Sequence, residues 1–182
     1  MLDRDEVYHR GSQVRQLLVP LAKAPGGPAW EIRAPAGAVV IGTHDGSPPV
    51  SRYQDWRFST RARSLRAMYY EVWAPTGEGA RHFLTKACLS VYRFERLERE
   101  TEILALHCDP EDQPHPDHPR LVNYKKAPHL HVMAAEEPIP KAHLGLVAGS
   151  IDDVLATASS LTEGLARSIA MKGHEVLDRY PT

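Results

Sequence analysis

The sequence predicts an α+β fold, in which an antiparallel β-meander sheet packs against a long C-terminal helix. Apolar residues recur at helical spacing near both ends of the chain, whereas the middle is rich in β-branched and aromatic residues. We expect one domain with four consecutive parts: an N-terminal helical arm over 1–24, a Pro/Gly-rich region with short strands over 25–64, the sheet over 65–149, and the C-terminal helix over 150–179.

The N-terminal helix is predicted over residues 3–19. Its apolar positions recur every three or four residues: Val7, Gly11, Val14 and Leu18. Pro20 ends the run because proline cannot continue a helix. The next region contains strand candidates over 30–33 and 38–41, and its polar, turn-rich middle over 42–64 is typical of a long surface loop.

The sheet is predicted from four segments: 65–73, 80–94, 101–108 and 129–134. A Pro-Thr-Gly turn at 75–77 separates the first two segments, as expected for a meander. Residues 109–128 contain five prolines and are expected to be irregular.

The C-terminal helix is predicted from its cap and its apolar stripe. Ser150 is a favourable N-cap residue, and Asp153 stands at capping-box spacing. The stripe comprises Ile151, Val154, Leu155, Ala158, Leu161, Leu165 and Ile169, and it continues to Val176 and Leu177. We expect this stripe to cover one face of the sheet.

Composition and charge narrow the classes of function. The chain has 182 residues and a net charge of −1 with neutral histidines, so the molecule as a whole does not attract polyanions. Its charged N-terminus lacks an apolar signal core, and no apolar run approaches the roughly 18 residues that span a bilayer. These features predict a cytoplasmic protein without a membrane partner.

One basic stretch could supply local affinity for nucleic acid. It contains Arg57, Arg61, Arg63 and Arg66, interleaved with Trp56 and Phe58. Cations beside aromatic rings suit a single-stranded nucleic acid, although a solvated surface is the simpler interpretation of this run.

The most informative feature is a cluster of histidines, because six of the ten fall between His107 and His143. Residues two apart in a strand share a face, so His129 and His131 should point away from Leu130 and Val132. The same rule pairs His107 with Asp109. Adjacent antiparallel strands could thus gather these residues on one surface, with His143 reaching it from a loop.

Two kinds of chemistry fit such a cluster. His107, Asp109, His129, His131 and His143 could hold a divalent transition metal, with further ligands from His115 and His118. Without a metal, one neutral and one protonated imidazole suit proton transfer, with Asp109 or Glu136 as the orienting group. Scattered surface histidines are the simpler alternative.

The residues before the histidine-bearing strand could bind phosphate: Arg120, Tyr124, Lys125 and Lys126. We therefore predict a small hydrolase that cleaves a phosphodiester, most simply RNA. His129, His131, His107 and Asp109 would be the catalytic group. Two alternatives stay open: a non-catalytic regulatory module with a structural metal or pH-sensing histidines, and a cupin-like metalloenzyme, suggested by the spacing of His129, His131 and Glu136.

The order of a meander, LALHCDP, an interrupted loop, Y-K-K-x-P-H-x-H and a terminal helix resembles the TumE-like toxins of bacterial toxin–antitoxin systems. The resemblance covers residues 100–145 and rests on His107, Asp109, Tyr124, His129 and His131. A long N-terminal extension and an expanded HPDH-bearing loop depart from that pattern. The resemblance implies a growth-inhibiting toxin that acts on RNA and is held in check by an antitoxin.

Overall fold

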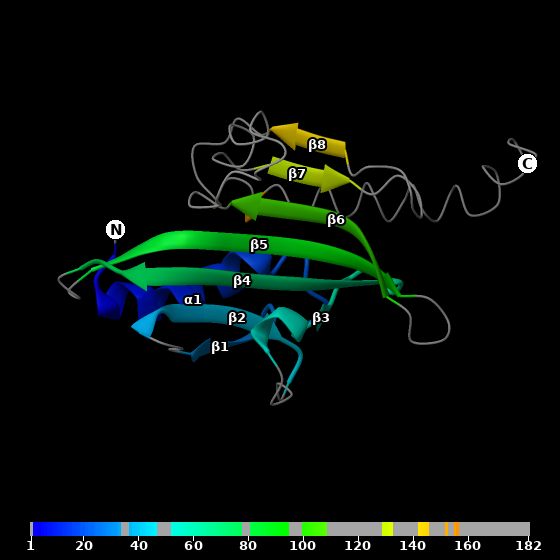
Figure 1. Ribbon diagram of the computed structural model, residues 1–182. Coiled ribbons are helices and arrows are strands. Elements are labelled where there is room, and N and C mark those ends of the chain that lie inside the picture. The colour runs from blue at the N-terminus through cyan, green and yellow to red at the C-terminus, as the bar shows by residue number, and fades with distance from the viewer. Residues whose placement is uncertain are drawn as a thin grey trace, which may run out of the picture.

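In the computed structural model, one N-terminal helix lies against an antiparallel sheet, so the α+β class is confirmed (Figure 1). The structure describes residues 2–32, 37–46, 52–77, 81–94, 100–106, 152 and 155–156, together with the backbone of 33, 107–108, 129–132 and 142–145. No helix within these residues has the length and apolar character needed to cross a bilayer.

The described elements follow one another as α1 (Arg4–Leu18), β1 (Ala29–Arg33), β2 (Val39–His44), the short 3-10 helix η2 (Tyr53–Asp55), β3 (Phe58–Ser59), β4 (Leu65–Pro75), β5 (His82–Phe94), β6 (Glu100–Cys108), β7 (His129–Val132) and β8 (Ala142–Gly145). The strands lie in the order β1-β2-β4-β5-β6-β7-β8. Each neighbouring pair is antiparallel, and β3 pairs with β4. The meander is therefore confirmed over the described residues.

The N-terminal helix forms where the sequence predicted it. Asp3 caps α1 through a reciprocal capping box, in which its side chain and that of Glu6 each accept a backbone N–H at 2.8 Å. The predicted apolar positions Val7, Val14 and Leu18 are fully buried. Apolar burial on this stripe thus fixes α1 against the sheet.

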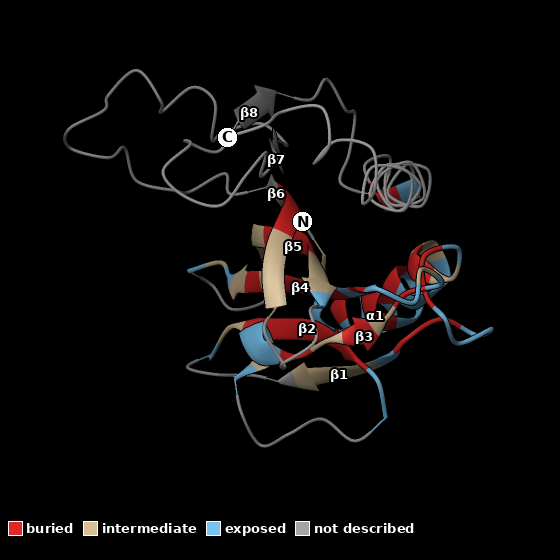
Figure 2. Cartoon of the chain, turned by 90° about the vertical axis from the view of Figure 1, so that its right-hand side faces the viewer, coloured by how far each residue is buried: buried red, intermediate tan, exposed pale blue. Residues whose placement is uncertain are grey.

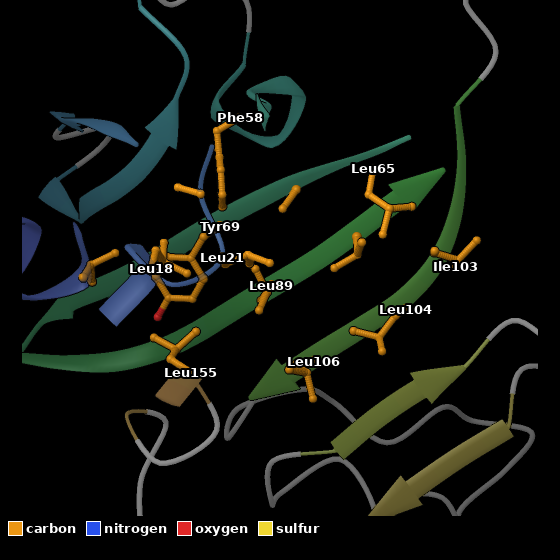
Figure 3. Packing of buried hydrophobic residues seen from close by; sticks show 14 residues of the cluster. Leu18, Leu21, Phe58, Leu65, Tyr69, Leu89, Ile103, Leu104, Leu106 and Leu155 are labelled. Atoms are coloured by element: carbon orange, nitrogen blue, oxygen red, sulfur yellow. The ribbon is translucent and has the colours of Figure 1, made fainter. Parts of the chain in front are cut away.

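The two faces of the sheet carry different cores. The face that packs on α1, called the α1 face below, holds the larger cluster; Figure 3 shows Tyr69, Leu89 and Leu106 within it. The opposite face holds the smaller cluster of Met68, Tyr70 and Cys88. Figure 2 shows how buried residues concentrate where α1 meets the strands. Alternation of side chains along β4 and β5 produces this division.

The predicted surface loop over 42–64 is wrong in its central part. Trp56 is 1 % exposed and Phe58 is 0 % exposed, and Phe58 pairs opposite Ala67 in the sheet. A Cβ atom on Gly42 would lie 2.8 Å from the Trp56 ring, so this glycine lets the indole approach β2. The polar composition of the segment concealed these isolated aromatic anchors.

The predicted C-terminal helix is described at three residues only. Backbone positions 152, 155 and 156 are helical, and Leu155 belongs to the core cluster on the α1 face. Ser150, Asp153 and the rest of the helix predicted over 150–179 lie outside the described residues. The predicted irregular segment over 109–128 also lies outside them.

Candidate functional site

The register of the last three strands brings four histidine positions together. His107 in β6 pairs opposite His129 in β7, and His131 in β7 pairs opposite His143 in β8. Residues directly opposite in an antiparallel pair share a face, as do residues two apart in one strand. The backbone therefore places all four positions on one face of the sheet.

This face can be identified from neighbouring strands. Cys88 pairs opposite His107, and Ser90 pairs opposite Ala105, which in turn pairs with His131. Cys88 is a buried thiol of the smaller core cluster, and its sulfur lies 3.4 Å from the Ser90 hydroxyl oxygen. The four histidine positions thus share the face opposite α1.

One element of this arrangement was not expected from the sequence. His143 was predicted in a loop, whereas it lies in β8, whose four residues pair with β7. The segment is short and contains Gly145, so its composition resembles a loop more than a strand. Pairing with β7 supplies the backbone hydrogen bonds that stabilise this segment as a strand.

Several predicted site residues lie outside the described residues: Asp109, His115, His118, Arg120, Tyr124, Lys125, Lys126 and Glu136. Among the side chains that the structure describes, no three from His, Cys, Asp or Glu are grouped to hold a metal ion. For the proposed metal ligands His107, His129, His131 and His143, the structure gives the backbone positions in β6, β7 and β8.

Two members of the arginine stretch, Arg57 and Arg66, are held by contacts within the fold. Arg57 donates to Glu100 at 3.2 Å and lies 4.0 Å from the centroid of the Tyr92 ring. Arg66 is also within 3.5 Å of Glu100 and lies over the ring of Phe94. Burial raises the pKa of Tyr92, although the charge of Arg57 opposes that rise. Since the predicted stacking residues Trp56 and Phe58 are core residues, they present no surface to a nucleic acid.

Sequence reasoning missed a buried ionic network on the α1 face. Glu71 is fully buried in β4 and accepts hydrogen bonds from Arg10 Nη2 at 2.8 Å and from Arg10 Nε at 3.0 Å. The Tyr69 hydroxyl donates to Glu71 at 2.6 Å, and Trp73 Nε1 donates at 2.9 Å. Arg10 also donates to both carboxylate oxygens of Asp152.

Two pKa shifts follow from this network. Burial by itself would lower the pKa of the Arg10 guanidinium, but hydrogen bonds to Asp152 and Glu71 outweigh burial and raise it. Burial raises the pKa of the Tyr69 hydroxyl well above its usual value, and the charge of Glu71 adds to the effect. Arg10 therefore stays charged and Tyr69 stays neutral at physiological pH.

A signal for this network was present in the sequence. Arg10 lies one position before Gly11 on the apolar stripe of α1, and Glu71 interrupts the apolar run Ala-Met-Tyr-Tyr-Glu-Val-Trp of β4. A charged side chain that must be buried needs a partner of opposite charge. These two residues are thus natural partners for each other.

Two other histidines lie apart from the four strand positions. His44 is at the end of β2 and meets Trp56 edge to face, with ring centroids 5.2 Å apart. His82 begins β5 and bridges to Leu2 through two backbone hydrogen bonds. Their buried Nδ1 atoms have no hydrogen-bond partner within the part of the chain that the structure describes. Neither residue adjoins β7 or β8 in the sheet order.

No protein-family model matches the chain, and neither a curated protein nor a solved structure matches it.

Proposed function

We propose that this protein cleaves phosphodiester bonds, with RNA as its substrate. The observation that carries the proposal is the register of β6, β7 and β8, which sets His107 opposite His129 and His131 opposite His143. Cleavage of a phosphodiester needs a proton acceptor and a proton donor within reach of the same phosphate. Neighbouring imidazoles supply both, because histidine titrates near neutral pH.

The chemistry of RNA makes two imidazoles sufficient. A neutral imidazole removes the proton from the ribose 2′-hydroxyl, whose oxygen attacks the adjacent phosphorus. A protonated imidazole gives its proton to the departing 5′-oxygen as the P–O bond breaks. A 2′,3′-cyclic phosphate and a 5′-hydroxyl result. His129 and His131 are proposed for the two proton transfers, with His107 and Asp109 in support.

Two further features support RNA as the substrate. Lys125 and Lys126 precede β7 in the sequence, where ammonium groups could neutralise charge on the phosphate. The resemblance of residues 100–145 to TumE-like toxins implies the same substrate. It also suggests a cognate antitoxin as a protein partner, a proposal that co-purification would test.

The test is cleavage of a fluorescent single-stranded RNA by the full chain, compared with DNA of the same sequence. We expect RNA to be cut and DNA to survive, because DNA lacks the attacking 2′-hydroxyl. His129→Gln and His131→Gln should each lower the rate by about 100-fold or more, as loss of a general acid or base does. His9→Gln is the matched control, since His9 is exposed on α1.

Three outcomes of this assay distinguish proton transfer by imidazole, a metal centre and the failure of the proposed function. Cleavage that survives EDTA and depends on both His129 and His131 supports proton transfer by imidazole. Cleavage that is lost in EDTA and restored by one transition metal assigns these histidines to a metal centre. Cleavage that is equal in all variants, or none by the wild type, contradicts the proposed function.

A further inference from the structure

A second feature of the α1 face concerns the residues near the C-terminus. Asp152 binds the outer edge of Arg10, with Nη1 to Oδ2 at 3.1 Å and Nη2 to Oδ1 at 2.5 Å. The inner edge of the same guanidinium is held by Glu71 through Nε and Nη2. Arg10 thus joins three parts of the chain: α1, β4 and the helical position 152.

The two carboxylates around Arg10 differ sharply in exposure. The side chain of Glu71 is 0 % exposed, whereas that of Asp152 is 46 % exposed. Water can therefore replace Arg10 as a partner of Asp152 without exposing the rest of the network. Arg10 would keep its bonds to Glu71 in the process, so separation of Asp152 leaves no buried charge unpaired.

An apolar contact accompanies the ionic one. Leu155 is 1 % exposed and belongs to the cluster that contains Tyr69, Leu89 and Leu106 (Figure 3). Asp152 and Leu155 are three residues apart, so in helical backbone they lie on the same side. The next residue, Ala156, is exposed. Asp152 and Leu155 thus contact the α1 side of the molecule through one charge and one apolar side chain.

We propose that the Arg10–Asp152 pair is a releasable latch for Asp152 and Leu155, whose backbone is helical. When the latch opens, Leu155 leaves the apolar cluster that contains Tyr69, Leu89 and Leu106. Arg10 and Glu71 meanwhile keep α1 fixed to β4. The opening is a local unfolding event, which needs less free energy than global unfolding because few contacts are lost.

The latch acts on a strand that bears a histidine position. Leu106 belongs to the same apolar cluster as Leu155 on the α1 face, and the next residue, His107, has its position on the opposite face of β6. Opening removes the apolar cover from one side of this strand. The device requires only the contacts of Arg10, Asp152 and Leu155, so it does not depend on the proposed function.

Amide hydrogen exchange on the full chain tests the latch. Asp152→Asn should speed exchange in the peptide over 152–156 by about tenfold or more, with β4 amides unchanged, because only the local opening becomes easier. About 1 M NaCl should have the same effect on the wild type and little on Asp152→Asn, since salt screens a half-exposed pair. Asp55→Asn is the control, because Asp55 forms an exposed pair with Arg52.

A second variant keeps the test decisive. Leu155→Ala removes the apolar contact but retains the ionic one, so it should speed exchange over 152–156 and keep its sensitivity to salt. The latch is overturned if Asp152→Asn leaves exchange at 152–156 unchanged. It is also overturned if β4 amides accelerate to the same extent, because the pair would then hold the whole fold.

Discussion

The centre of the sheet and its edge at β7 and β8 differ in how they are built. In the centre, β4 has 11 residues and β5 has 13, and their α1 face surrounds a buried carboxylate that accepts from Arg10, Tyr69 and Trp73. Toward the edge, β7 and β8 have 4 residues each and carry His129, His131 and His143.

Stability and chemistry therefore reside in different regions of this molecule. Long strands with a closely packed core determine whether the chain folds, and a substitution there acts on the free energy of unfolding. The short strands β7 and β8 pair over four residues, so residues there can serve chemistry at small structural cost. Substitutions in the two regions should therefore have effects of different kinds.

The largest expected effect is at Glu71. Glu71→Gln leaves Arg10 as a buried charge without its inner partner, and loss of one member of a buried ion pair costs about 3–5 kcal/mol. Urea denaturation of the variant and the wild type would measure this difference. Glu100→Gln is the matched control, because Glu100 pairs with Arg57 and Arg66 at 22 % exposure. A loss for Glu71→Gln as small as that for Glu100→Gln would contradict the asymmetry.

The next effect concerns two glycines that touch indole rings. Gly42→Ala should lower the free energy of unfolding by about 1–3 kcal/mol, because its Cβ would press on the buried Trp56 ring. Gly11→Ala also crowds an indole, that of Trp30, but this ring is only partly buried and the helix gains about 1 kcal/mol from alanine. Thermal melts should rank Gly42→Ala as the less stable variant; the reverse order would contradict it.

Alkaline pH should weaken the packing between α1 and the centre of the sheet. The pKa of Tyr69 is raised in the folded state, so the folded protein retains a proton that the unfolded chain loses above pH about 10. The stability that this group contributes is complete below that pH and is lost as the pH rises through the folded pKa. Urea titrations on either side of pH about 10 would measure the loss. Tyr69→Phe should be less sensitive to this rise, and equal sensitivity would contradict the assignment.

The smallest expected effect on stability is in β7. His129→Gln and His131→Gln should change the free energy of unfolding by less than about 1 kcal/mol, because each replaces one polar side chain with another in a strand of four residues. Denaturation curves recorded beside the cleavage assay would show this. Loss of folding in either variant would assign these histidines to structure, and the comparison between the two regions would fail.

Features that depend on residues close together in the sequence could be predicted from it. The spacing of Val7, Val14 and Leu18 predicted α1, and β-branched and aromatic runs predicted β4, β5 and β6. The face of His129 and His131 followed from alternation with Leu130 and Val132. Where local signals were weak, as at Phe58 and His143, sequence reasoning assigned loops to residues that pair in the sheet.

The segments that form α1 and the long strands could be predicted from the residues alone, because helical and strand periodicity are local properties. Which distant residues meet depends instead on how the whole chain packs. Arg10 and Glu71 are 61 residues apart, and Arg10 and Asp152 are 142 apart. The pairing of His107 with His129 is of the same kind. Such contacts are set by strand register and by the requirement that buried charges find partners, and neither condition can be evaluated until the whole chain has packed.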